Sequence, residues 1–197
     1  MKLSEQSLSS KVLELVHDGY SVLGPQLNLD DCIVVSRAPA ECLIIAGLTM
    51  SGGSFNQHVE LRDFHFENAH LNVVTFTGKF VGCDFGDWDD ISTSSIENCD
   101  FKECELDGVR FLNADVDTIA LPKWPHFFIR SPGKCNPNID TKNLPKKLGI
   151  TLSVYFDEEP ECSAIVGHAQ RLAEENEISM EQIRVMLSRI ENVEFQD

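Results

Sequence analysis

From residue 91 to residue 121, every fifth residue of the chain is apolar. The positions are Ile91, Ile96, Phe101, Leu106, Phe111, Val116 and Leu121. A helix would spread this spacing around its surface, because five residues advance about 500°. A flat strand would alternate these side chains between its two faces. The spacing therefore predicts a chain that turns a corner about every five residues and closes a four-sided coil in about twenty, with every fifth side chain inside.

The same register extends upstream, with one interruption. It holds at Leu61, Phe66, Leu71 and Phe76, slips by one residue to Phe80 and Phe85, and recovers at Ile91. We interpret residues 80–90 as a coil with a bulge or loop, placed at Gly82, Gly86 or the acidic run of residues 87–90.

Small residues recur two positions before the large apolar side chains, at Ala69, Cys83, Cys99, Cys104 and Ala114. In Cys83-Asp84-Phe85, Cys99-Asp100-Phe101, Cys104-Glu105-Leu106 and Ala114-Asp115-Val116 the chain resembles the pentapeptide-repeat family. Units of that family combine a small residue, Asp or Asn, Leu or Phe, and two variable residues. The resemblance covers about residues 28–121. It implies a right-handed quadrilateral β-helix.

The raw ends of such a coil would expose unpaired backbone groups, so both ends need a cover. At the N-terminal end, Ser4 or Ser7 could cap a helix whose apolar face is Leu8, Val12, Leu15 and Val16. We therefore expect residues 1–27 to form a helical cap.

A different segment follows Leu121, where Pro122 ends the five-residue pattern. Residues 151–156 are typical of a strand, and residues 162–174 of a helix. Ser179 and Gln182 have the spacing of a capping box that opens a second helix. We expect residues 122–197 to form an α/β or helical subdomain on the last coil, so that the whole protein is mainly β.

Composition narrows the class of protein. No stretch approaches the roughly 18 apolar residues of a membrane helix, and Glu5 and Glu14 interrupt any signal-peptide core. We therefore expect a cytoplasmic protein that does not enter a membrane. The seven cysteines are odd in number and lack a CxxC motif. They are best explained as reduced core residues.

The negative charge is concentrated in two blocks. The chain carries a formal charge of −16, of which residues 84–117 hold −9 and residues 157–197 hold −8. A basic connector, residues 122–150, lies between them. This distribution argues against direct nucleic-acid binding, because phosphate contacts need Lys and Arg. It favours a basic protein as partner, since complementary potentials speed association.

The candidate partner-binding residues come from these two blocks. Trp88, between acidic residues, could anchor an interface or could fold back over the bulge as a small satellite core. The full set is Trp88, Asp89, Asp90, Asp100, Glu105, Asp107, Asp115, Glu174, Glu175 and Glu177. Whether the coil or the tail binds the partner stays open, and each single acidic residue could simply keep the surface soluble.

Residues suited to catalysis or metal binding do not converge. His65 and His70 are five apart and are expected outside the coil on neighbouring faces, where they could not share a metal ion. Spacing aligns no nucleophile, base and orienting residue. We therefore expect a protein that is not an enzyme and uses no metal or cofactor.

Three functions remain after these exclusions. The first is a cytoplasmic immunity protein that binds and neutralises a basic antibacterial toxin, because a small acidic protein with a repeat scaffold and an added terminal subdomain resembles members of toxin-immunity pairs. Such a protein should be a monomer alone. The second follows from the family resemblance: some pentapeptide-repeat proteins mimic DNA and bind type II topoisomerases such as gyrase. Those proteins resemble longer, nearly unbroken coils, whereas this chain has a loose start and a large tail. The third is an assembly scaffold whose coils pack side by side.

Overall fold

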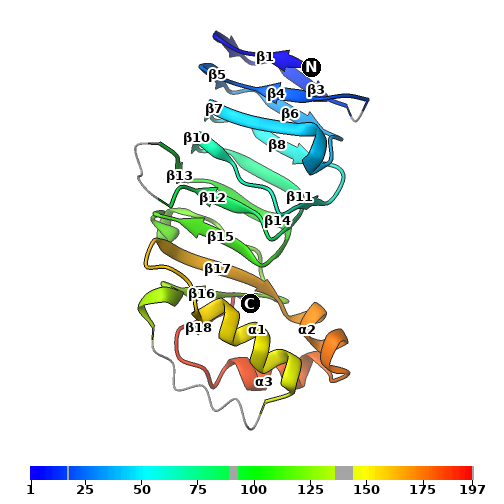
Figure 1. Cartoon of the computed structure of the whole chain (residues 1–197), viewed down its shortest axis with the longest axis vertical. Helices are drawn as coiled ribbons and strands as arrows, with labels where there is room; N and C mark the ends of the chain where they lie inside the picture. Colours follow the sequence, from blue (N-terminus) through cyan, green and yellow to red (C-terminus); the bar gives the residue numbers. More distant parts are fainter. Residues whose placement is uncertain (17, 89–92, 136–143, 197) are drawn as a thin grey trace.

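The chain winds into a β-solenoid of about four turns, with helices at its C-terminal end (Figure 1). This architecture is taken from a computed structural model, which describes residues 1–16, 18–88, 93–135 and 144–196. The coils stack along the long axis of the molecule, from the N-terminal strands to the C-terminal helices. The prediction of a β-helix with helices in its C-terminal part is therefore confirmed.

Parallel sheets run along the stack and hold the coils together. The first contains β1 (Lys2–Leu3), β2 (Gln6–Ser9), β4 (Ser21–Leu23), β5 (Leu27–Asp30), β7 (Leu43–Ser51), β10 (Glu67–Asn72) and β13 (Ser95–Glu97). The second contains β3 (Val12–Leu15), β6 (Ile33–Ser36), β8 (Ser54–Gln57), β9 (Leu61–Arg62), β11 (Thr75–Val81) and β14 (Asp100–Asp107). Short 3₁₀ turns lie at Ala40–Cys42, Val116–Thr118 and Pro132–Lys134.

The length of one coil agrees with the sequence pattern. Leu27 pairs with Leu48, 21 residues later, and Asp100 bridges to Ala120, 20 residues later. Across the predicted slip the spacing grows, since His70 pairs with Ser95, 25 residues later. The longer interval contains the stretch between β12 (Asp84–Gly86) and β13, where the sequence register slips. Ile91 lies outside the described residues.

Inward side chains form ladders that run through the coils. In one ladder Val34, Phe55 and Phe76 occupy paired positions, and the Phe76 ring stacks on Phe101 with centroids 4.5 Å apart. In another, Phe66 stacks on Phe85 at 4.3 Å. The described members of the five-residue register are all buried: Leu61, Phe66, Leu71, Phe76, Phe80, Phe85, Ile96, Phe101, Leu106, Phe111, Val116 and Leu121. The same residues that predicted the coil therefore build its core.

The cysteines sit in or beside this core as thiols. All seven are free, as expected. The Cys83 thiol donates to the carbonyl of Leu61 at 3.3 Å, and that of Cys99 to the carbonyl of Glu97 at 3.3 Å. Burial raises the pKa of both thiols to about 11. They therefore act as small core residues rather than as reactive groups.

The prediction of an N-terminal helical cap within residues 1–27 is wrong. Residues in this stretch form β1 to β5, and Val12 pairs with Ile33 in register. The relevant pattern is alternation, because Leu13 and Leu15 are buried whereas Val12 and Glu14 are exposed. Pairing with the next coil has overridden the helical spacing of Leu8, Val12, Leu15 and Val16. The first coil of the solenoid thus stands where a lid was expected.

Two of the C-terminal predictions need correction. Residues 151–156 belong to helix α1 (Lys146–Phe156), not to a strand, because Leu148, Leu152 and Tyr155 form one buried helical face. Residues 162–168 form strand β17 (Cys162–His168), so only the second part of the predicted helix exists, as α2 (Ala169–Asn176). The third prediction is confirmed: Ser179 and Gln182 form a capping box at the start of α3 (Met180–Leu187).

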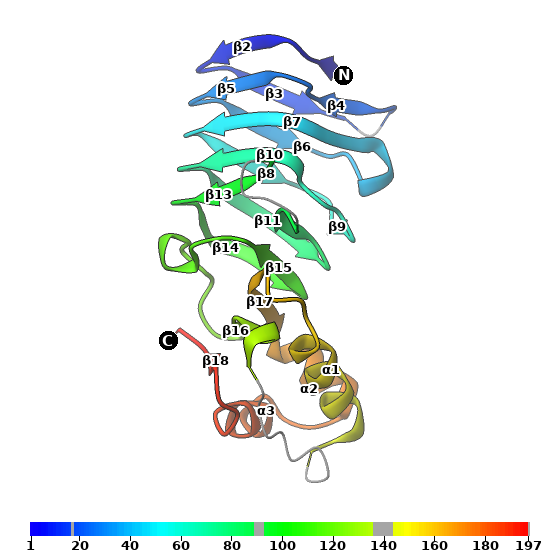
Figure 2. The same ribbon diagram turned by 60° about the vertical axis from the view of Figure 1, so that its left-hand side comes forward.

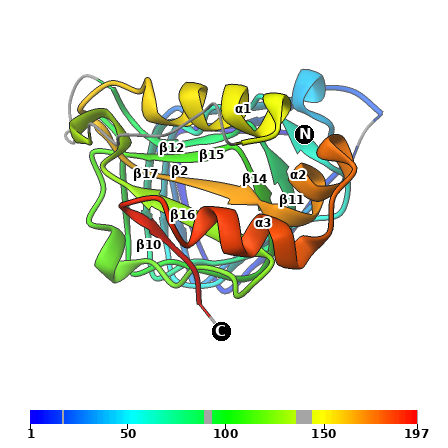
Figure 3. The same cartoon turned by 90° about the horizontal axis from the view of Figure 1, so that it is seen from below.

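The C-terminal segment closes the end of the solenoid. Strand β17 pairs antiparallel with β15 (Val109–Leu112). On its other side β17 pairs with β16 (His126–Arg130), and β16 pairs with β18 (Val193–Glu194), so the order of this sheet is β12-β15-β17-β16-β18. Phe128, Ala164 and Val166 join the core of the coil, whereas Phe127 and Ile129 pack with the helices. Figure 3 shows β16 and β17 crossing the end of the coil. The tail is therefore bonded into the stack.

Two neighbouring glycines test how closely the coils are packed. A Cβ atom on Gly53 would lie 1.9 Å from the carbonyl oxygen of Cys32 in the coil before, whereas one on Gly52 would meet nothing closer than 3.7 Å. Both have positive φ angles, so Ala costs each about 1–2 kcal/mol of backbone strain. We expect Gly53→Ala to lower the free energy of unfolding by at least about 3 kcal/mol and Gly52→Ala by only about 1 kcal/mol, measured by urea denaturation. Equal losses would contradict this packing.

Candidate functional site

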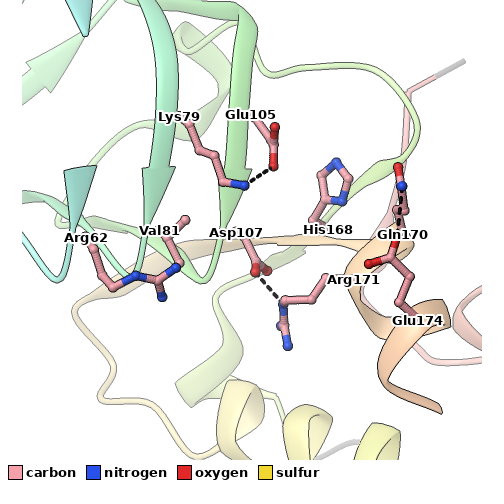
Figure 4. A pocket seen from close by; sticks show the side chains of 9 residues that line it. All are labelled: Arg62, Lys79, Val81, Glu105, Asp107, His168, Gln170, Arg171 and Glu174. Carbon is pink, nitrogen blue, oxygen red and sulfur yellow. Dashed lines mark hydrogen bonds and ion pairs between the residues drawn. The ribbon is translucent and has the colours of Figure 1, made fainter. Parts of the chain in front are cut away.

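A groove of about 400 Å³ lies where the coil meets helix α2 (Figure 4). One wall comes from β9, β11 and β14, and the other from the end of β17 and the start of α2. We call it the junction groove, and its lining residues are Arg62, Lys79, Val81, Glu105, Asp107, His168, Gln170, Arg171 and Glu174. Acidic residues of the coil and of the tail thus share one site.

Ion pairs hold the side chains of the coil wall in place. Lys79 Nζ lies 2.7 Å from Glu105 Oε1 and 3.5 Å from Glu60 Oε2. The hydrogen bond that Lys79 donates to Glu105 raises the pKa of Lys79, and the hydrogen bond that Arg62 donates to Glu60 lowers the pKa of Glu60. These groups are exposed enough for water to screen them, so they contribute little stability. They nevertheless hold the charged side chains of this wall in fixed positions.

At the centre of the groove, Arg171 joins the tail to the coil. Its Nε pairs with Asp107 Oδ2, its Nη1 lies 2.8 Å from Glu175 Oε1, and its Nη2 donates to the hydroxyl of Tyr155 at 3.2 Å. Burial acts to lower the pKa of Arg171, but the hydrogen bonds with Asp107 and Glu175 raise it overall. Asp107 is only 8% exposed, and its Oδ1 has no hydrogen-bond partner among the described residues. An ordered water or an inserted donor would satisfy this oxygen.

Two histidines pack beside the groove. The rings of His126 and His168 meet edge to face with centroids 4.7 Å apart. His126 Nε2 accepts the backbone N–H of Leu106 at 3.0 Å, and Nδ1 lies 3.0 Å from the carbonyl of Lys123. These two bonds together require a neutral ring with its proton on Nδ1. Burial lowers the pKa of both histidines, against the opposing influence of Glu105 and Asp107.

A second arginine joins coil and tail elsewhere. Arg110 on β15 donates from Nε to Asp84 Oδ1 at 2.7 Å and from Nη2 to Asp84 Oδ2 at 2.9 Å. Its Nη1 reaches Glu158 of the tail at 3.4 Å. The Trp88 ring lies 5.1 Å from the guanidinium carbon, and Trp88 packs against the C-terminal core. This position matches the satellite-core interpretation of Trp88.

The fold gathers some of the other candidate residues in the junction groove and leaves the rest apart from it. Glu105, Asp107 and Glu174 line the junction groove. Glu175 forms an ion pair with Arg171, which also lines it. Asp100 accepts from the backbone N–H of Lys102, and Asp115 caps the 3₁₀ turn at Val116–Thr118. Glu177 is exposed at the end of α2. Asp89 and Asp90 lie outside the described residues.

Sequence reasoning missed the basic partners of these acids. Arg110 carried a signal, because it stands at the pentad position that is Asp or Glu at residues 100, 105 and 115. Arg171 had a weaker one, since Glu175 follows at i+4 on the same helix face. For Lys79 the sequence offered no signal, because its partner Glu105 is one coil away.

The junction groove presents charged side chains from strands on one wall and from a strand end and a helix on the other. Within the described ranges, no group of three or more His, Cys, Asp or Glu side chains could hold a metal ion. The described helices include none that is both long and apolar enough to cross a membrane. What the groove offers is a fixed set of charges on two rigid walls, which suits recognition of a charged surface.

No protein-family model, curated protein or solved structure matches this chain. The resemblance to pentapeptide-repeat proteins therefore rests on the motif residues alone.

Removing Arg110 should weaken the attachment of the tail to the coil. Asp84 and Glu158, whose side chains are 12% and 11% exposed, would lose their cation. Breaking such a buried pair costs about 3–5 kcal/mol. We expect this loss of unfolding free energy for Arg110→Met in urea denaturation. For Arg62→Met, which breaks an exposed pair with Glu60, we expect less than about 1 kcal/mol. Similar losses for both variants would mean that Arg110 does not clamp the tail.

The histidine pair should make stability depend on pH. Because the folded protein lowers the pKa of His126 and His168 below 6.5, the unfolded chain takes up protons first as the pH falls. The unfolding free energy should therefore decrease from pH 7 to pH 5, by at most about 1.4 kcal/mol per pH unit for each proton. His126→Gln should flatten this slope, because it removes one of the two histidines whose pKa the fold lowers. An unchanged slope in His126→Gln would contradict the assignment.

Proposed function

We propose that this chain is a non-enzymatic, acidic protein-binding module that binds and neutralises a basic protein. The most concrete form of the proposal is a cytoplasmic immunity protein of the pentapeptide-repeat kind, whose partner is a cognate bacterial toxin. The junction groove and the acidic surface around it would form the binding face. A coil that holds its side chains on stacked, hydrogen-bonded strands is a rigid platform for such a face.

One observation carries the proposal: the fold brings the two acidic blocks together. Residues 84–117, with a charge of −9, and residues 157–197, with −8, are far apart in sequence. The pairing of Val109 with Val166 and of Phe111 with Ala164 places them side by side. Residues 84–197 as a whole, with the basic connector included, carry −12, whereas residues 1–83 carry −4. The molecule is therefore polarised along its length, and a basic protein would be steered to the C-terminal half.

The basic residues near this face support a protein rather than a nucleic acid as partner. Lys79, Arg110, Arg130 and Arg171 each lie in ion pairs with carboxylates of this chain. A phosphate backbone would have to displace those carboxylates. Mimicry of DNA for a type II topoisomerase ranks second, because Glu105 and Asp107 are partly neutralised by their own cations and do not form an uninterrupted acidic track.

The proposal is tested by capture followed by rescue. Purified protein would be used to capture partners from its native cells, and a captured basic protein would be expressed in a host whose growth it arrests. Co-expression of the wild-type chain should restore growth. Glu105→Lys/Glu174→Lys/Glu177→Lys should fail to do so, because like-charge contacts cost several kcal/mol and weaken binding about 100-fold or more.

A matched variant controls for net charge. Glu14→Lys/Glu41→Lys/Glu67→Lys changes the charge equally at exposed positions of the first coils, and it should still rescue growth. Equal failure of both variants would mean that only net charge matters. Capture of topoisomerase subunits instead of a basic toxin would replace the proposal with DNA mimicry.

A further inference from the structure

The junction groove contains a buried carboxylate oxygen that no residue of the described chain uses. The side chain of Asp107 is 10% exposed, and its Oδ2 pairs with Arg171. Its other oxygen, Oδ1, is buried and accepts no hydrogen bond from any residue that the structure describes. Native proteins satisfy nearly all buried acceptors, because an unsatisfied one is costly. The torsion that rotates a carboxylate is soft, so Oδ1 can meet a donor that enters the groove.

The charges around this oxygen leave the groove acidic. Three cations stand in or beside it, and each is already paired with carboxylates of this chain. The cations are Arg62, Lys79 and Arg171, and their carboxylate partners are Glu60, Glu105, Asp107 and Glu175. Glu174 adds a fifth carboxylate, which accepts from the amide of Gln170 at 2.9 Å. Three positive groups against five negative ones give a local charge of −2. Burial lowers the pKa of His168, so this residue adds no charge at pH 7.

This arrangement selects a cation rather than an anion as the occupant. An anion would have to displace the carboxylates that already hold Lys79 and Arg171. A cationic donor would instead satisfy Asp107 Oδ1 and offset the excess of negative charge. The groove of about 400 Å³ is large enough to take one long side chain.

The spacing of the carboxylates favours a guanidinium over an ammonium group. Glu105 and Asp107 are two residues apart on β14, so they stand on one face of the strand about 7 Å apart. A guanidinium carries donors on several edges and can bond to two carboxylates at once, whereas an ammonium group is a compact, strongly hydrated point charge. Arg171 already behaves in this way, because it bonds to Asp107 and Glu175 together. The aliphatic stem of an entering arginine would pack against Val81.

We propose that the junction groove is the recognition site for one arginine side chain of the partner, whose guanidinium bonds to Asp107 and Glu105. The inference deepens the proposed function and rests on it for the partner being a basic protein. Both the coil and the tail build the site. Figure 2 shows β9 and β11 ending on the side of the stack below which α1 and α2 lie. The tail must therefore be docked for the arginine to be recognised.

Titration of the isotope-labelled full chain with capped peptides, followed by two-dimensional NMR, tests the site. The probes are acetyl-Gly-Arg-Gly-amide and the corresponding peptides with Lys or Gln in place of Arg. The arginine peptide should shift the backbone amide signals of Asp107, His168 and Arg171 with a saturable, millimolar dissociation constant. The lysine peptide should bind at least about threefold more weakly, and the glutamine peptide should cause no saturable shift. Equal shifts from all three peptides, equal binding of the arginine and lysine peptides, or no shift at these residues would overturn the proposal.

Variants of single carboxylates locate the bound guanidinium. Asp107→Asn should weaken the arginine peptide by about 10-fold or more, because it removes the buried charge. Asp31→Asn removes the same charge at an exposed position near the N-terminal end, with a positive φ angle that Asn tolerates. It should stay within about twofold of wild type.

A second groove variant keeps the test valid if Asp107→Asn does not fold. Glu105→Gln changes a side chain that is 49% exposed, so it should leave folding intact. We expect it to weaken the arginine peptide by about threefold or more. Wild-type affinity in Glu105→Gln, or in a folded Asp107→Asn, would overturn the proposal.

Failure of this inference can be told apart from failure of the proposed function. A captured basic protein that binds folded Asp107→Asn as tightly as wild type would overturn the arginine site and leave the proposed function in place. Saturable binding of the arginine peptide by a chain that captures no basic protein would support the site and contradict the proposed function.

Discussion

Each strand of this protein has two hydrogen-bonding edges, and the rest of the structure depends on how those edges find partners. Inside the stack each coil satisfies the coil before and the coil after it, and the buried ladders fix the register. At the C-terminal end the tail supplies the missing partner, because β17 turns antiparallel and bonds to β15. Arg110 reinforces that closure by its ion pair with Glu158, and Arg171 does so by its ion pair with Asp107.

The repeating part of the fold could be predicted because its signal is local and periodic. Seven residues spaced by five, from Ile91 to Leu121, were enough to predict a coil of about twenty residues. The two ends could not be predicted in the same way. Leu8, Val12 and Leu15 fit a helical stripe, and only pairing with the second coil shows that Leu13 and Leu15 are the buried residues. Likewise, α1 contains Ile150, Thr151 and Val154, which favour strands, but tertiary packing makes it a helix.

The candidate site, like the fold, could be predicted from the sequence only in part. Glu105, Asp107 and Glu174 were chosen for their charge alone, and the fold places them in one groove because residues 109 and 166 are paired. The cations that hold those carboxylates are Lys79 and Arg171, whose positions depend on contacts across coils and across the tail. Acidic blocks can therefore be seen in a sequence, whereas their internal neutralisation can be seen only in the structure. This internal neutralisation decides which negative groups remain available to a partner.

Hydrogen–deuterium exchange on the dilute protein, followed by peptide, tests the central claim most directly: that the tail is a bonded layer of the solenoid and so unites the two acidic blocks. Amides of β15 and β17 should exchange as slowly as those of β11 in the middle of the stack, because pairing buries them equally. If β17 exchanged as fast as an unstructured segment while β11 stayed protected, the tail would be a separate attachment and the shared acidic face would not exist.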